Sequence, residues 1–207
     1  MNSVCSVGLE RLAEAIIQRM TIEIEASGRH VHLSRGDVEA LFGTGYQLTK
    51  VKDLSQPGQF ACAERVTLKG PKGEFTNVVI LGPERPDSQV ELSLSDAVSL
   101  GVRAPIRLSG DIKDTPGITI QNGTRQIILP RGAIVAKRHI HMTPEDAERF
   151  GMRDGQRVSF RTFTERPLVF GDIEVRVSPK FSTVAHLDYD ESNACGFHKG
   201  DRGMIVG

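Results

Sequence analysis

The sequence lacks several features that would assign it to a common class of protein. It has no tryptophan and two tyrosines among its 207 residues, and no apolar run approaches the ~20 residues that a membrane-spanning helix needs. The 26 basic and 26 acidic residues balance, which argues against a nucleic-acid-binding surface and against an acidic disordered tail. The N-terminus has neither the basic start nor the continuous apolar core of a secretory signal. We therefore expect a cytoplasmic protein with no membrane and no nucleic acid partner.

Cysteine is also scarce. Cys5, Cys62 and Cys195 form no CxxC pair, and an odd number in a chain of this size does not indicate a disulfide scaffold. A reducing, cytosolic environment is the simplest interpretation. Cys62 lies among small and apolar residues at 60–63, which favours a structural thiol over a nucleophile.

Residues 1–20 have the pattern of an amphipathic helix. Apolar side chains recur at helical spacing along one face, and charged or amide side chains occupy the other. The apolar face consists of Leu9, Leu12, Ile16, Ile17 and Met20. Such a helix either packs on its own domain or places its apolar face in the groove of a partner protein, and the pattern leaves both interpretations open.

The rest of the chain is typical of a mainly β protein with short α-helices. Its 21 glycines and 10 prolines separate short runs of β-branched and aliphatic residues. Helices are expected at 34–42, 95–100 and 143–150, because each stretch begins with Ser or Thr, which cap helix N-termini. Residues 184–188 are expected to form a strand that is followed by acidic residues and a turn.

One motif occurs twice. Residues 29–34 read Arg-His-Val-His-Leu-Ser and residues 138–143 read Arg-His-Ile-His-Met-Thr, and an acidic segment ending in Phe-Gly follows each copy. An internal duplication explains the repeat. It predicts two similar β-rich halves, at about 21–110 and 111–207, with the helix of residues 1–20 appended to them. Closing a sheet into a barrel would remove exposed edges from each half.

The paired histidines carry the strongest chemical signal. Residues i and i+2 of a strand point to the same side, so each His-x-His motif presents two imidazoles to one point, while Val31 or Ile140 faces the opposite side. The histidines of the two motifs are His30, His32, His139 and His141. Two adjacent imidazoles are a natural chelate for zinc, which usually takes a third protein ligand. Glu91, His186 and His198 are candidates for that ligand, and Glu91 could equally form a salt bridge.

Arg85 lies in the turn Gly-Pro-Glu-Arg-Pro at 82–86. A guanidinium held in a rigid turn is suited to bidentate binding of a phosphate or a carboxylate, although a solvated surface arginine has the same pattern. The chain contains no P-loop, no GxGxxG placed between a strand and a helix, and no GxSxG nucleophile motif.

Taken in order, these motifs resemble those of phosphate propanoyltransferases, the phosphotransacylases of propanediol-utilising bacterial microcompartments. The matching segments are 29–32, 82–85, 89–91, 138–141 and 193–194, and the resemblance covers the chain from about residue 22 to residue 207. It implies a fold of two β-barrel domains with short helices, in agreement with the duplication.

The resemblance also implies the site residues. It implies two zinc ions per chain, with Arg85 as the catalytic residue that binds phosphate. The implied ligands of the first zinc are His30, His32 and Glu91. The implied ligands of the second zinc are His139, His141 and His186. The residues implied near coenzyme A are Ser27, Lys52, Leu81, His186 and Asn193.

The implied reaction converts a short-chain acyl-CoA and phosphate to an acyl phosphate and coenzyme A, in either direction, by direct attack of phosphate on the thioester. Three alternatives stay open. They are a metal-dependent acyl-CoA hydrolase, a non-catalytic microcompartment protein that zinc stabilises, and a small-molecule or metal-binding module. Acetyl-CoA and propanoyl-CoA differ by one methylene, worth ~1–3 kcal/mol of discrimination, so the preferred acyl chain is left open.

Residues 1–20 resemble the encapsulation peptides that direct enzymes into the lumen of bacterial microcompartments. The resemblance therefore implies a location inside such a compartment and contact with shell or lumen proteins through this helix. A homo-oligomer is expected.

Overall fold

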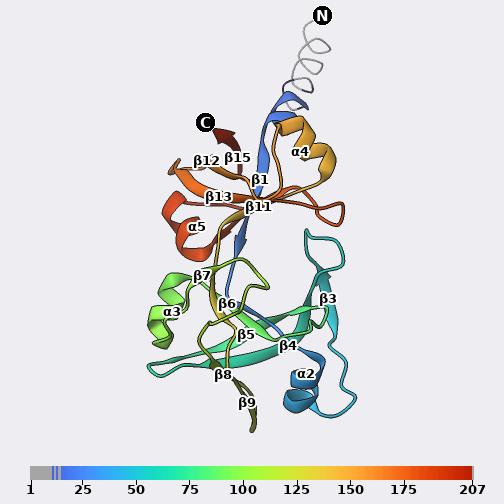
Figure 1. Cartoon of the computed structure of the whole chain (residues 1–207), viewed down its shortest axis with the longest axis vertical. Helices are drawn as coiled ribbons and strands as arrows, with labels where there is room; N and C mark the ends of the chain where they lie inside the picture. Colours follow the sequence, from blue (N-terminus) through green and yellow to red (C-terminus); the bar gives the residue numbers. More distant parts are fainter. Residues whose placement is uncertain (1–10, 12, 14, 207) are drawn as a thin grey trace, which may run out of the picture.

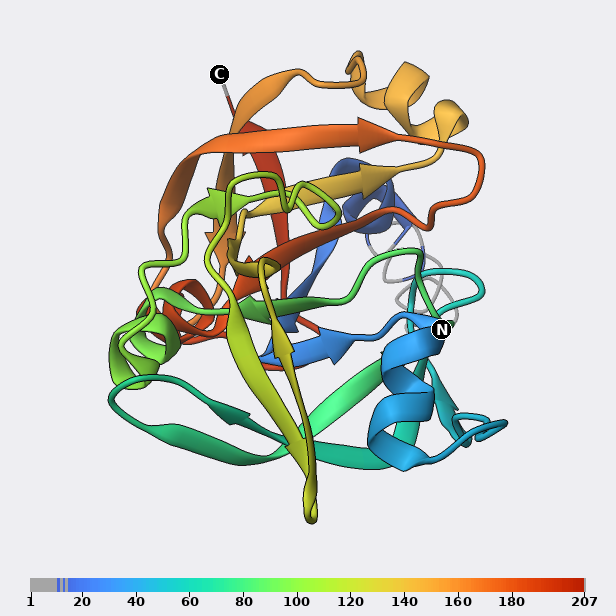
Figure 2. The same ribbon diagram turned by 60° about the horizontal axis from the view of Figure 1, so that its bottom comes forward.

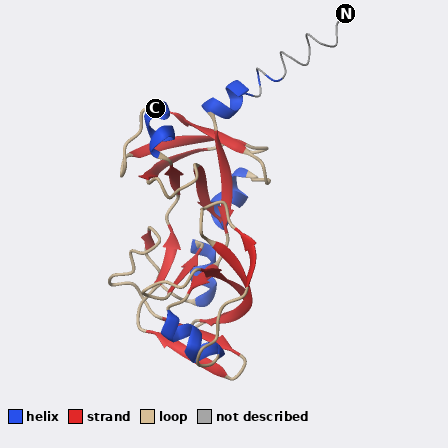
Figure 3. Cartoon of the chain, turned by 90° about the vertical axis from the view of Figure 1, so that its right-hand side faces the viewer, coloured by secondary structure: helices blue, strands red, loops and turns tan. Residues whose placement is uncertain are grey.

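The computed structural model describes residues 11, 13 and 15–206, and it is mainly β, as the sequence predicted, with 43% strand and 19% helix. Two strand-rich halves are stacked along the long axis of the molecule (Figures 1 and 3). Within the described part of the chain, no helix combines the length and the apolar character needed to cross a bilayer.

One half is a closed barrel of six strands in the order β1-β14-β11-β13-β12-β15. Its strands are β1 (Ile22–Ser27), β11 (His139–Met142), β12 (Arg157–Phe163), β13 (Val169–Val177), β14 (Val184–Asp188) and β15 (Arg202–Val206). β1 pairs in parallel with β14 and antiparallel with β15, so a strand from the start of the chain closes a barrel built from its end.

The other half is a nine-stranded sheet in the order β7-β10-β6-β2-β5-β4-β8-β9, with β3 paired to β4. Its strands are β2 (His30–His32), β3 (Lys50–Asp53), β4 (Phe60–Lys69), β5 (Glu74–Gly82), β6 (Gln89–Leu92), β7 (Ile106–Arg107), β8 (Ile118–Asn122), β9 (Arg125–Leu129) and β10 (Ala133–Ala136). The sheet curls into a half-barrel, and the β8–β9 hairpin projects from its end (Figure 2). The predicted pair of barrels is therefore one closed barrel and one curled, open sheet.

The two sheets exchange strands across the predicted boundary at residue 110. β1 belongs to the barrel of the second half, while β8, β9 and β10 belong to the sheet of the first half. β10 lies beside β6 in parallel, as β1 lies beside β14 in the barrel, so the first half lends one strand and the second half lends three. The division into domains at residue 110 stays a prediction, but the chain crosses between the sheets on both sides of it.

Four short helices accompany the sheets. They are α2 (Arg35–Phe42), α3 (Leu94–Leu100), α4 (Pro144–Phe150) and α5 (Tyr189–Cys195). In α2 and α4 the backbone N–H of the third helical residue donates to the hydroxyl of Ser34 or Thr143, which is the capping that the sequence predicted. The sequence pattern did not indicate α5, where the Asp188 carboxylate accepts from the Glu191 N–H and starts a helix in the expected turn.

Each half has its own hydrophobic core, and the two cores use the residues between the paired histidines. Val31 and Ile140 are fully buried, one in each core. The predicted alternation is therefore confirmed: the apolar residue of each His-x-His motif points into a core, and the histidines point the other way. The cores hold β2 and β11 in place and so fix where the imidazoles lie.

The predicted N-terminal helix lies partly outside the described residues. Residues 15–20 are helical, and the Thr21 N–H donates to the carbonyl of Ile17. Ile16, Ile17 and Met20 are exposed, so these described apolar side chains do not pack against the body of the protein. Leu9 and Leu12 lie outside the described residues.

Candidate active site

The first histidine pair meets Glu91 through strand register. β2 and β6 are antiparallel, with His30 opposite Glu91 and His32 opposite Gln89. The Nε2 atoms of His30 and His32 lie 3.5 and 3.6 Å from Glu91 Oε1, and all three side chains are buried. Two nitrogens and one carboxylate oxygen therefore converge on one point.

The second pair meets His186 in the same way. β11 and β14 are antiparallel, with His139 opposite His186. His141 Nδ1 lies 3.2 Å from His186 Nε2, and the rings of His139 and His186 stack with centroids 4.9 Å apart. Three imidazoles thus form a second cluster, and within each cluster the candidate ligand atoms lie within 4.8 Å of one another.

Backbone carbonyls fix the orientation of three of these rings. The Nδ1 atoms of His30, His32 and His139 lie 2.8, 3.1 and 2.8 Å from the carbonyls of Gly28, Leu81 and Lys137. A carbonyl accepts and cannot donate, so Nδ1 carries the proton in each ring. The Nε2 lone pair is then free to point into the cluster, as a metal-ligating imidazole requires.

Burial sets the charge of the second cluster. Burial, and then the neighbouring His139, lowers the pKa of His141 to about 3. Burial also lowers the pKa of His139 and holds that of His186 well below its ordinary value. These imidazoles are therefore neutral at neutral pH, which is the form that binds a metal.

The first cluster has a different electrostatic balance. Burial alone would raise the pKa of Glu91, but the charges and hydrogen bonds of His30 and its neighbours hold it well below its usual range. Burial also opposes the charge on His30, yet Glu91 outweighs this effect and raises the His30 pKa. Burial and then His30 hold the His32 pKa well below its usual range. The carboxylate is therefore ionised and can neutralise part of a bound cation.

Arg85 lies next to the first cluster and is held by both backbone and side chain. Its N–H donates to the Leu33 carbonyl, and its Nη1 donates to Ser109 Oγ over 2.8 Å. Ser109 also accepts from Gln89 Nε2, which donates to Glu91 Oε1 over 2.5 Å. Burial lowers the pKa of Arg85, but a guanidinium keeps its charge at neutral pH. The network fixes a positive charge beside Glu91.

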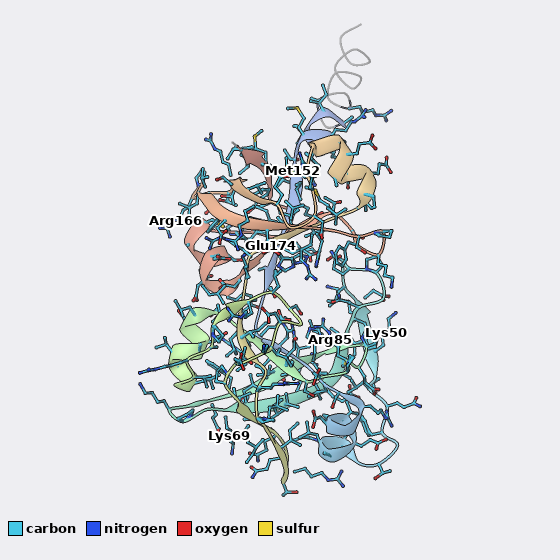
Figure 4. All side chains as sticks on the ribbon, in the orientation of Figure 1. Lys50, Lys69, Arg85, Met152, Arg166 and Glu174 are labelled. Atoms are coloured by element: carbon cyan, nitrogen blue, oxygen red, sulfur yellow. The ribbon has the colours of Figure 1, made fainter. Side chains whose placement is uncertain are left out.

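Both clusters open on one cavity of about 470 Å³ between the two halves. Figure 4 shows Arg85 on the half that contains the open sheet, on the side that faces the barrel. This cavity is lined by Arg85 and by the six residues that the family resemblance implied as zinc ligands. These six are His30, His32, Glu91, His139, His141 and His186. Residues from two sequence repeats and two sheets therefore share one chamber.

The residues expected near coenzyme A fall into two groups. Ser27 and Leu81 line the cavity, as does His186. Lys52 and Asn193 are exposed, on β3 and α5, and neither is among the described residues that line the cavity. The first group lies beside the clusters and the second lies on the outer surface.

The sequence pattern did not indicate several residues that line the cavity or bond to its lining residues. Arg176 lies opposite His141 in the β11–β13 pair, and the Phe181 ring lies 4.1 Å from the His141 ring, centroid to centroid. Ser109 and Gln89 link Arg85 to Glu91. Gln89 could have been found because it stands two residues before Glu91 on the same strand and so shares its face. Arg176 gives no such signal, since only the pairing of β13 with β11 brings it to the cavity.

The described cysteines do not reach this site. Cys62 and Cys195 are buried, and neither lines the cavity. Burial raises the pKa of the Cys62 thiol to about 11, so it stays protonated at neutral pH. This agrees with the structural role that the sequence favoured, because a thiolate is the nucleophilic form.

Two compact ligand clusters and a fixed guanidinium in one cavity define an enzyme-type site that suits an anionic substrate. The phosphate propanoyltransferase family model matches residues 23–198. The chain is 57% identical over 206 residues to a phosphate propanoyltransferase of Enterococcus faecalis, with 100% of this chain and 97% of that protein covered. It is 54% identical to one of Clostridioides difficile, over 96% and 97% of the two chains. A phosphate propanoyltransferase of Thermotoga maritima is 50% identical, over 89% of each chain.

The chain therefore belongs to the phosphate propanoyltransferase family and is a transferase. The resemblance inferred from the sequence motifs is thus confirmed at the level of the family.

Proposed function

We propose that this enzyme transfers a short acyl group, propanoyl or acetyl, reversibly between the thiol of coenzyme A and inorganic phosphate. The single observation that carries the proposal is the shared cavity, which Arg85 lines together with two clusters of potential metal ligands. The family name supports the choice of phosphate and a propanoyl group as substrates.

We propose that each cluster holds one zinc ion, with His30, His32 and Glu91 on one and His139, His141 and His186 on the other. The residues fit such a group. Three imidazoles are fixed by carbonyls with Nε2 free, the second cluster is neutral, and the Glu91 carboxylate is ionised. Three protein ligands leave a position open, as catalytic zinc sites do. When bound, zinc supplies Lewis-acid stabilisation of the oxygen that becomes negative.

Arg85 is the proposed phosphate-binding residue. Its Nη1 is already engaged by Ser109, so the guanidinium is held in one orientation before phosphate arrives. A preorganised fork matches two phosphate oxygens at once and needs no reorganisation in the transition state. Phosphate held there lies beside the first cluster, where a thioester carbonyl would have to be placed for attack.

The proposed chemistry is direct acyl transfer. A phosphate oxygen forms a bond to the acyl carbon, the carbon–sulfur bond breaks, and coenzyme A leaves as its thiolate. No step needs a protein nucleophile, in keeping with the positions of Cys62 and Cys195 away from the cavity. Trapping of a covalent acyl-enzyme would overturn this part.

Ser27 and Leu81 are proposed to contact the part of coenzyme A nearest the thioester, because both line the cavity. Lys52 and Asn193 are proposed to contact the charged part of coenzyme A that lies farther from the thioester. Both are exposed, Lys52 on β3 and Asn193 on α5. The exposed helix at residues 15–20 supports docking to a shell or lumen protein of a microcompartment, and a homo-oligomer remains part of this proposal.

A thiol-release assay tests the proposal. Purified enzyme is given propanoyl-CoA with and without phosphate, before and after treatment with a chelator. We expect release of coenzyme A that requires both phosphate and metal. Release without phosphate would instead indicate a thioesterase that uses water, and release that is unaffected by chelation would contradict the zinc part.

A further inference from the structure

Glu25 stands beside His186 on the neighbouring strand. β1 and β14 pair in parallel, and Glu25 is the register partner of His186. On β1, Ile22 and Ile24 are buried in the barrel core, so the alternate residues face away from it. Glu25 lines the cavity with His186, whereas Glu23, on the same strand, is exposed.

The Glu25 carboxylate faces the outer nitrogen of His186. His186 directs Nε2 toward His141, so its Nδ1 lies on the side of the ring away from the cluster. Glu25 Oε2 lies 3.8 Å from this Nδ1, and it is the one carboxylate oxygen that comes within 4.0 Å of His186 among the described residues. In His30, His32 and His139 a backbone carbonyl occupies the corresponding place. Glu25 therefore lies on the side of His186 that a carbonyl occupies in the other three rings, at a longer distance.

A residue from the opposite half holds this carboxylate. Ser55, in the loop between β3 and β4, donates its hydroxyl to the same Oε2 atom over 2.6 Å. The next residue, Gln56, is 5% exposed and bonds Ser182 at both ends, with its Nε2 donating over 3.0 Å and its Oε1 accepting over 3.3 Å. Ser182 lies just before β14, which carries His186. The loop of the open sheet thus contacts the barrel at Glu25, beside His186, and at Ser182, which precedes the strand of His186.

Building on the proposed zinc site, we propose that Glu25 is a positioning residue that fixes the His186 imidazole with Nε2 toward the cluster, and that Ser55 holds Glu25 for this task. A carboxylate that accepts from the outer nitrogen sets the tautomer and raises the basicity of a metal-ligating histidine. At 3.8 Å the contact is longer than a hydrogen bond, so the proposed role requires a short movement of the ring or the carboxylate when the metal binds. The second cluster is thereby coupled to the docking of the loop that contains Ser55 and Gln56.

The test measures zinc binding rather than turnover. Wild-type enzyme, Glu25→Ala, Glu25→Gln and Ser55→Ala are titrated with zinc against a chelator of known affinity, and cobalt spectra report the geometry at each site. Glu23→Gln is the matched control, because Glu23 lies on the same face of the strand but is exposed and does not line the cavity. We expect Glu25→Ala to weaken one of two sites by about 10- to 100-fold. Glu25→Gln retains an acceptor oxygen and should lose less zinc affinity than Glu25→Ala. Ser55→Ala should also lose less zinc affinity than Glu25→Ala, and Glu23→Gln should bind zinc as the wild type does.

A double variant shows whether Glu25 acts through His186. In a chain that already carries His186→Ala and retains about one zinc ion, the change Glu25→Ala is expected to leave the zinc affinity of the remaining site unchanged. Unchanged zinc affinity in Glu25→Ala, or weaker zinc binding at the remaining site of the double variant, would overturn the inference. If the wild-type chain binds no zinc, the proposed zinc site fails as well. If the wild type binds two zinc ions and Glu25→Ala binds them with the same affinity, only the positioning role of Glu25 is overturned.

Discussion

Glu91 and His186 occupy equivalent places in the two halves of the molecule. Each lies on a strand antiparallel to a His-x-His strand, directly opposite the first histidine of the motif. The duplication that repeats the histidines therefore repeats the whole arrangement, but with a carboxylate in one copy and an imidazole in the other. The two clusters share a frame and differ in charge, since Glu91 adds a negative charge to the first and the second is neutral.

This equivalence predicts how metal is lost. Glu91→Ala and His186→Ala should each remove one third ligand and so lower the zinc content from about two ions per chain to about one. The exposed His198 is the control, because His198→Ala leaves both clusters complete. Elemental analysis of the purified variants measures the result. Two zinc ions in both cluster variants would show that these residues are not ligands.

Arg85 should control the use of phosphate. Arg85→Ala is expected to lower kcat/KM for phosphate by about 100- to 1,000-fold, because a preorganised donor to a developing charge is lost. Arg85→Lys should recover part of this loss, since it restores the charge but not the fork. Zinc content should stay that of the wild type.

The exposed Arg131, paired with Asp87 at the surface, provides the control for Arg85. Arg131→Ala should turn over phosphate as the wild type does. Steady-state kinetics at varied phosphate concentration measure kcat/KM for phosphate in each variant. An Arg85→Ala enzyme with the wild-type value would contradict the role assigned to Arg85.

The metal-free chain should lose stability in mild acid. Burial lowers the folded pKa of His141 to about 3 from an ordinary value of 6.5, so between these pH values the unfolded chain binds more protons at this site. Its contribution to the free energy of unfolding therefore falls as the pH drops below about 6.5, by at most about 1.4 kcal/mol per pH unit. Urea unfolding of chelator-treated protein at neutral and acidic pH measures this effect.

The variant His141→Gln supplies the comparison for the acid effect, because it removes the titrating group and keeps a polar side chain. Its unfolding midpoint should depend less on pH than that of the wild type. An identical pH dependence in the two proteins would mean that His141 does not contribute.

The N-terminal helix should be dispensable for catalysis. Deleting residues 1–20 removes no residue of the cavity, so turnover is expected to match the full chain, while co-purification with microcompartment shells is expected to be lost. Replacing Ile16 and Ile17 with Ser should have the same effect, because both are exposed apolar side chains. Replacement of Gln18 with Ser serves as the polar-face control. A truncated chain that still co-purifies with shells would exclude the docking role.

The local part of this structure could be predicted from the sequence. Period-two alternation placed Val31 and Ile140 in cores and the histidines on the opposite face, and the hydroxyl caps located α2 and α4. These features depend on residues close together in the chain, where spacing alone defines geometry. The family resemblance supplied the grouping of Glu91 and His186 with their histidine pairs.

Long-range pairing could not be predicted in this way. The exchange of β1 and β10 between the sheets leaves no local pattern in the sequence. The alternation of buried and exposed residues along a strand does not depend on which sheet the strand joins. For the same reason no local pattern indicated Arg176, which reaches the cavity through its register with His141, or Glu25, which reaches His186 through the exchanged strand.

The most direct test of the account is a zinc titration of the metal-stripped enzyme, with propanoyl phosphate formed from propanoyl-CoA and phosphate followed by phosphorus NMR. If both clusters take part in transfer across the shared cavity, product formation should stay low after the first equivalent of zinc per chain and reach its full rate with the second. Full activity without zinc, or coenzyme A released with no propanoyl phosphate formed, would contradict the account.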